Sequence, residues 1–301
     1  MYLREPPELT RNSSVAVIIC GMLREWEHCV ESFHKNFIMP NKTSLDIDIF
    51  LVTYDITDRY KTNRKIKEKI SNDEFKNLKK QFNTENLHIL NFEKNKQEIL
   101  DYMNSTDSLP TEITTNKTQR DFIETIYMQS HLLKQSLNFV NNKKYDCIMR
   151  TRFDILYDKR FIVSTSLMPG YIYQLPFNGN QNFVDNCFLG DFESMKETLS
   201  SYDFLLENPS STMISASHGE KGPALEYVFL NNMKKNNIRS VVNENWKVSL
   251  LRDASVSPLS KHPNWKFNSL ELYYNPQKGE QVQIDEHKFM IPAQAKGIKI
   301  K

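Results

Sequence analysis

Glycine and cysteine are scarce in this 301-residue chain, and several common binding motifs are absent from it. Among its 8 glycines, none forms a G-x-G-x-x-G dinucleotide fingerprint or a G-x-x-x-x-G-K-[ST] phosphate loop. The 4 cysteines lie far apart and form no C-x-x-C pair, which argues against a zinc ribbon. The 39 basic residues barely exceed the 37 acidic ones, so the charge does not favour nucleic acid as a partner.

Long hydrophobic runs are also absent. The longest, "VAVIICGML" at 15–23, is far shorter than the roughly 20 apolar residues that a membrane span needs. The first residues, "MYLREPPELTRNSS", lack the apolar core of a signal peptide. We therefore expect a cytoplasmic protein with no transmembrane segment. Its length suits one large domain, which we place at 14–255, between an N-terminal tail (1–13) and a C-terminal extension (256–301).

Strand and helix patterns alternate along the proposed domain. Four apolar, β-branched segments predict strands: "SVAVIICG" (14–21), "DIDIFLVTYD" (46–55), "NLHILNFE" (86–93) and "YDCIMRTRFDI" (145–155). Helical spacing follows the first strand and recurs over 119–140, and the charged stretch 59–82 also predicts a helix. A further helix is expected over 191–206, with Asp191 as its N-cap. The order predicts an α/β fold whose central sheet is mostly parallel and flanked by helices.

An R-x-R-x-D triplet stands out at the fourth predicted strand. Arg150, Arg152 and Asp154 are spaced so that an extended chain directs all three side chains to one side. Guanidinium groups suit phosphate oxygens, and a carboxylate at a strand end can hold Mn²⁺ or Mg²⁺, which bridges a diphosphate. A structural Arg–Asp pair that closes the strand explains the triplet equally well.

Two other strands end in residues that belong to the same edge, because ligands of parallel sheets bind at the carboxyl ends of strands. Gly21 and Arg24 follow the first strand, and Thr53 and Asp55 end the second. Gly21 would let the backbone approach a ligand, although a plain turn also uses glycine. Asp55 would bind a ribose hydroxyl or cap a loop.

Three later residues are further candidates. Asp185, in a polar loop, would act as a base or sugar ligand, or simply stabilise a turn. Glu226 interrupts an apolar helical pattern and either faces solvent or points into a cleft. His218 would contact a phosphate, although a solvated histidine fits its polar surroundings as well.

Five segments in this order resemble a known family: "VAVIICGMLREWEHC", "DIDIFLVTYD", "YDCIMRTRFDI", "DNCFLGDFESM" and "ALEYVFL". They carry G-x-x-R, D-I-F-x-x-T and R-x-R-x-D, and they resemble the glycosyltransferase-like proteins of the WavE and viral capsid-glycan type, over roughly 14–255. The resemblance implies a GT-A-like, Rossmann-like fold and polysaccharide biosynthesis from a nucleotide-sugar donor. It also implies that Asp154 binds the metal, with Arg150 and Arg152 beside the donor. Arg152 occupies the first acidic position of the usual D-x-D motif, so an arginine could replace the cation.

The implied mechanism needs positive charge at the leaving diphosphate. Mn²⁺ or Mg²⁺ on Asp154 would supply it, together with Arg24, Arg150 or Arg152. In an inverting enzyme Asp185, or as second choice Glu226, would deprotonate the glycan acceptor, whereas in a retaining enzyme both would bind sugar. Two alternatives remain open: a metal-dependent nucleotidyltransferase or phosphoesterase, and a non-catalytic module that binds nucleotide sugars.

Overall fold

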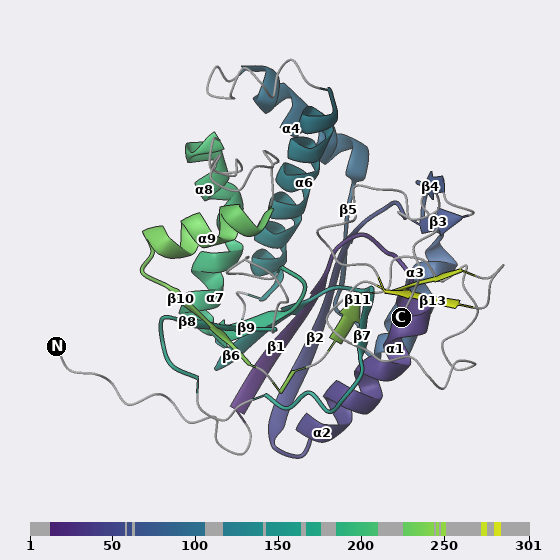
Figure 1. The fold of residues 1–301 in the computed structure, drawn as a ribbon, viewed down its shortest axis with the longest axis vertical. Helices are drawn as coiled ribbons and strands as arrows, with labels where there is room; N and C mark the ends of the chain where they lie inside the picture. The colour runs from purple at the N-terminus through teal and green to yellow at the C-terminus, as the bar shows by residue number, and fades with distance from the viewer. Residues whose placement is uncertain are drawn as a thin grey trace.

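A computed structural model describes residues 13–57, 59–61, 64–105, 117–140, 143–163, 167–175, 185–209, 225–243, 245–246, 248–250, 272–275 and 280–283. Their centre is a seven-stranded sheet in the order β10-β8-β9-β6-β1-β2-β5 (Figure 1). Its strands are β1 (Ser13–Cys20), β2 (Leu45–Tyr54), β5 (Leu87–Leu90), β6 (Cys147–Thr151), β8 (Tyr171–Gln174), β9 (Phe188–Asp191) and β10 (Arg239–Val242). β9 alone among them runs antiparallel to its neighbours, and the other pairings are parallel.

Helices cover both faces of this sheet (Figure 1). One face carries α4 (Phe92–Ser105), α6 (Lys117–Val140), α7 (Phe192–Leu199), α8 (Ser201–Glu207) and α9 (Leu225–Lys235). The other carries α1 (Trp26–Phe33), its π-helical continuation (His34–Ile38), α2 (Met39–Asn41) and α3 (Asn72–Phe82). Small two-stranded pairings complete the described structure: β3 (Arg59–Lys61) with β4 (Arg64–Ile66), β7 (Ile155–Tyr157) with β11 (Val248–Leu250), and β12 (Leu272–Asn275) with β13 (Glu280–Gln283).

The sequence of β1 explains why it lies at the centre of the sheet. Its side chains alternate between two hydrophobic cores, with Ala16 and Ile18 under α6 and Val17 and Ile19 under α1. A strand buried on both faces needs apolar residues at every position, and a continuous apolar run supplies them. Burying a valine or isoleucine side chain contributes about 1.5–3 kcal/mol, so burial favours a central position for this strand.

The predicted α/β fold with a mostly parallel sheet flanked by helices is confirmed. The predicted cap is confirmed too, since the Asp191 carboxylate accepts hydrogen bonds from the backbone N–H groups of Glu193 and Ser194. The single helix expected over 59–82 is wrong in its first half. That half forms the β3–β4 hairpin, and α3 begins only after Ser71, whose side chain caps it.

No helix in the described part of the chain has the length and apolarity to cross a bilayer. The longest of them, α6, has 24 residues and carries charged and polar side chains throughout its length.

Candidate functional site

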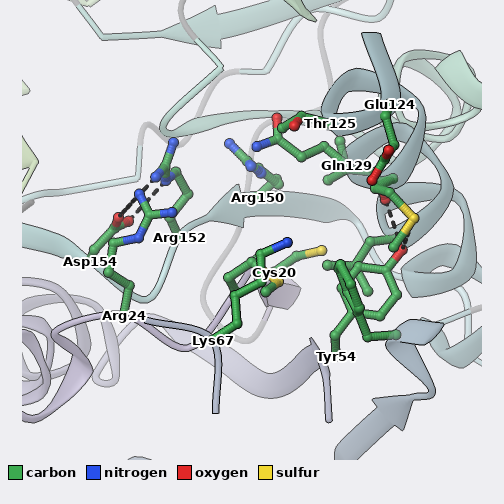
Figure 2. Close-up of a pocket in the computed structure, with 16 residues that line it drawn as sticks. Cys20, Arg24, Tyr54, Lys67, Glu124, Thr125, Gln129, Arg150, Arg152 and Asp154 are labelled. Carbon is green, nitrogen blue, oxygen red and sulfur yellow. Dashed lines mark hydrogen bonds and ion pairs between the residues drawn. The ribbon is translucent and has the colours of Figure 1, made fainter. Parts of the chain in front are cut away.

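A pocket of about 210 Å³ lies where β1, β2 and β6 end, against α6 (Figure 2). The parallel pairing of these strands brings their carboxyl ends together, as the sequence predicted. The pocket is lined by the end of β1 and its following turn (Cys20, Gly21, Met22, Arg24), by Tyr54, Lys67 and Phe92, by α6 (Glu124, Thr125, Met128, Gln129, Leu132, Leu133), and by β6 with the turn after it (Arg150, Arg152, Asp154).

A strained turn places Arg24 in the pocket wall. Gly21 has φ 153°, which side-chain-bearing residues rarely adopt, and its N–H donates to the Val52 carbonyl at 3.2 Å. Glu25, directly before α1, is buried and has φ 51°, a left-handed conformation that is uncommon for glutamate. Backbone strain of this kind persists where the surrounding structure holds it, and it often occurs at functional sites.

Asp154 is paired with two arginines. Arg152 donates from Nε and Nη2 to the two carboxylate oxygens of Asp154, both at 2.8 Å. The Nη1 of Arg24 lies 3.7 Å from Oδ2 of the same carboxylate. Asp154 is only 2% exposed. The structural Arg–Asp pair that the triplet allowed is therefore present, and it forms part of the pocket wall.

Arg150 differs from Arg152 and Asp154. Its Nε and Nη1 make no ion pair or hydrogen bond with the described residues. It pairs with Ile18 of β1 and with Phe188 of β9 in the sheet, and its side chain projects toward α6 (Figure 2). The guanidinium lies 5.8 Å from the ring centroid of Phe188. Burial lowers the pKa of Arg150 and the charge of Asp185 opposes that shift. A guanidinium still stays protonated, so the pocket holds a buried cation.

The donor atoms do not fit the metal site that the resemblance implies. Both oxygens of Asp154 already accept hydrogen bonds from Arg152. The other acid of the lining, Glu124, forms an ion pair with Lys96 at 2.9 Å. No group of three or more potential metal-binding acids, histidines or cysteines occurs in the described ranges. Mn²⁺ and Mg²⁺ prefer several oxygen ligands, and this wall offers guanidinium donors instead.

The ends of β1 and β2 contribute neutral residues to the lining. The Tyr54 hydroxyl donates to the Met128 carbonyl at 2.9 Å and so joins the end of β2 to α6. Cys20 also lines the pocket, and burial raises the pKa of its thiol to about 12, although Arg150 partly opposes the shift. Its thiol is therefore protonated at neutral pH and is not an activated nucleophile.

Two predicted residues at the end of β2 and just after it lie outside the lining. Thr53 is fully buried, and its hydroxyl donates to the Tyr54 carbonyl at 3.2 Å. Asp55 accepts hydrogen bonds from the N–H of Phe92 at 2.8 Å and from Asn91 at 3.2 Å. Asp55 was expected either to bind a ribose hydroxyl or to cap a loop. In the structure its carboxylate caps the start of α4.

The predicted bases also lie outside the lining. Asp185 is buried and interacts electrostatically with Arg150, so it belongs to the surroundings of the pocket. Glu226 lies half-buried in the first turn of α9 and does not line the pocket. His218 lies outside the described residues.

Sequence reasoning missed several lining residues. Lys67 comes from the segment after β4, and its Nζ lies 4.5 Å above the ring of Phe92. Glu124, Thr125 and Gln129 come from α6, where they flank its apolar stripe. Polar residues bordering an apolar stripe were the signal available on α6, whereas nothing in the local sequence distinguished Lys67 from the many lysines around it.

No protein-family model matches the chain, and no curated protein matches it either.

Proposed function

We propose that this protein is a glycosyltransferase that moves a sugar from a nucleotide-diphosphate sugar to a glycan or another hydroxyl acceptor. The observation that carries the proposal is the buried guanidinium of Arg150, which has no ion-pair partner among the described residues and faces a pocket at the carboxyl edge of a parallel sheet. We further propose that the fold is of the GT-A type and that the reaction serves polysaccharide synthesis in the cytoplasm.

The chemistry requires positive charge where the donor breaks. As the bond from the sugar to the diphosphate cleaves, negative charge builds up on the phosphate oxygens, and preorganised cations stabilise it. In this proposal Arg150 receives the diphosphate, and Arg152 and Arg24 add positive charge beside it. The neutral wall formed by Thr125 and Gln129 would contact the uncharged sugar.

The acceptor hydroxyl must lose its proton. Asp185 is the carboxylate that we assign to this step for an inverting reaction, because it lies close enough to Arg150 to interact with it electrostatically. Glu226, in the first turn of α9, is the second choice; like Asp185 it lies outside the pocket lining. For a retaining reaction these residues would bind sugar instead.

The test is a donor panel. The purified chain is incubated with UDP-, GDP-, ADP- and dTDP-sugars, and the released nucleoside diphosphate is measured. We expect release from one nucleotide class, a loss of about 10²-fold in Arg150→Met, and no change in Arg239→Met on the exposed edge strand β10.

The same panel includes nucleoside triphosphates. Turnover of triphosphates with no turnover of any sugar nucleotide would replace the proposal by a nucleotidyltransferase or phosphoesterase. Binding of a sugar nucleotide without any turnover would favour a non-catalytic binding module.

A further inference from the structure

We infer that this pocket binds the diphosphate group without a divalent cation, with Arg150 as the binding residue and Asp154 as the residue that positions Arg152 and Arg24. The inference rests on the proposed function and specifies how its site takes the leaving group. The ligand class is a nucleoside diphosphate or the pyrophosphate group of one.

Arg150 is a buried cation in the lining of the pocket. Its side chain is about nineteen-twentieths buried, since the residue is 5% exposed, and Nε and Nη1 have no hydrogen-bond partner within the described ranges. Buried guanidinium donors without acceptors are costly, and native proteins rarely keep them unless a ligand accepts their hydrogen bonds. The guanidinium lines the pocket, so the missing partner is an anion in that pocket.

The lining of the pocket carries more positive than negative side chains. The lining contains the four cations Arg24, Lys67, Arg150 and Arg152 and the two carboxylates Glu124 and Asp154, and four minus two leaves a positive excess of two. Such an excess favours a multiply charged anion. Planar guanidinium forks match the oxygens of phosphate groups, which makes a diphosphate the best fit.

The hydrogen bonds of Asp154 leave no room for a metal on its carboxylate oxygens without rearrangement. A cation bound to Asp154 would have to displace the Arg152 fork from both carboxylate oxygens. It would also lie beside Arg24, whose Nη1 is 3.7 Å from Oδ2, and would meet like charge there. The Asp154 carboxylate therefore holds guanidinium groups in place, and the arginines supply the positive charge that a metal supplies elsewhere.

The test is calorimetric titration of the full chain with inorganic pyrophosphate, UDP, GDP and ADP, first in EDTA and then in Mn²⁺. We expect pyrophosphate and at least one nucleoside diphosphate to bind in EDTA, with the dissociation constant changing by less than about threefold in Mn²⁺. Arg150→Met should weaken binding by about 10- to 100-fold, because it removes charge-assisted hydrogen bonds. Arg150→Lys should recover part of that loss, and Arg239→Met should bind like the unaltered protein.

Asp154→Asn tests the positioning role. It should weaken binding in EDTA, and Mn²⁺ should not become necessary or more effective, because the residue acts through the arginines. A circular dichroism melt of each variant shows that it is folded, and Arg150→Lys remains available if Arg150→Met does not fold.

Two results would overturn the inference: binding that requires Mn²⁺, or binding that Arg150→Met and Arg150→Lys leave unchanged. Its failure is distinguishable from that of the proposed function. Metal-free binding without turnover of any sugar nucleotide would refute the transferase and keep the anion site. Sugar transfer that depends on Mn²⁺ would refute the metal-free site and keep the transferase.

Discussion

Arg152 donates two parallel hydrogen bonds to Asp154, two residues farther along the chain, with both donor–acceptor distances at 2.8 Å. The chain can make this contact because β6 ends at Thr151 and turns before β7 begins at Ile155. The pair separates the roles within the R-x-R-x-D triplet. Arg152 is bound to the carboxylate, and Arg150 is left facing the pocket.

Removing the carboxylate should destabilise the fold. Asp154→Ala leaves Arg152 and Arg24 without their shared partner in a buried setting, which should cost about 3–5 kcal/mol of unfolding free energy. Urea unfolding followed by circular dichroism measures the change. Asp203→Ala is the control, because its half-exposed ion pair with Lys134 should contribute about 1 kcal/mol at most. A loss below about 1 kcal/mol in Asp154→Ala would show that the pair is not structural.

Arg150→Met should have the opposite effect on stability. It replaces a buried guanidinium, whose Nε and Nη1 have no hydrogen-bond partner among the described residues, by an apolar side chain of similar length, so the free energy of unfolding should rise by about 1–3 kcal/mol. The melting temperature should then rise by a few degrees, about 2–4 °C per kcal/mol. Scanning fluorimetry without ligand measures it, with Arg239→Met as control. A lower melting temperature would mean that Arg150 stabilises the empty fold.

Gly190→Ala tests the packing of β9 between β6 and β8. A Cβ at this position would lie 2.9 Å from the Tyr171 carbonyl oxygen and 2.9 Å from Cδ1 of Ile172. The backbone oxygen cannot move without disturbing the sheet, so we expect a loss of about 1–3 kcal/mol. Thermal unfolding of Gly190→Ala and of the parent protein measures the difference in stability. A variant as stable as the parent would contradict the close contact with the Tyr171 carbonyl oxygen.

The acid dependence of stability should involve Asp48. Burial acts to raise the pKa of its carboxyl, but hydrogen bonds from Tyr145 and Lys143 outweigh that effect and lower the pKa below its usual range. A depressed carboxyl pKa gives stability that is present above the unfolded pKa of about 3.9 and is lost as the pH falls through the folded value.

Tyr145→Phe removes one of those hydrogen bonds. It should reduce stability by about 0.5–1 kcal/mol at pH 7, the low end for a charged acceptor because the carboxylate is partly exposed. The difference from the parent protein should shrink below pH 4 as Asp48 becomes protonated. Urea midpoints between pH 2.5 and 7 measure this, and a difference independent of pH would remove Asp48 as the cause.

The sequence by itself determined the central layer and the edge that carries the site. The apolar run of β1, the apolar second half of β2 and the apolar residues that begin β6 are typical of a sheet buried on both faces, and burial dominates the energetics of such segments. Arg150, Arg152 and Asp154 all line the pocket, but β6 ends at Thr151, so the turn after the strand, and not an extended alternation of side chains, places Asp154 there. Segments with weaker hydrophobic patterns did not reveal their secondary structure. The edge strand β10, partly exposed, and the β3–β4 hairpin carry no strong periodicity.

Only the tertiary structure decided which polar groups meet. Asp55 caps α4 and Asp154 pairs with Arg152, while Lys67 and Glu124 arrive at the pocket from segments far away in the chain. Hydrophobic burial depends on the pattern of a segment and is non-directional, so a sequence reveals it. Hydrogen bonds and ion pairs depend on distance and angle between groups brought together by packing, so their partners are fixed only when the fold is complete.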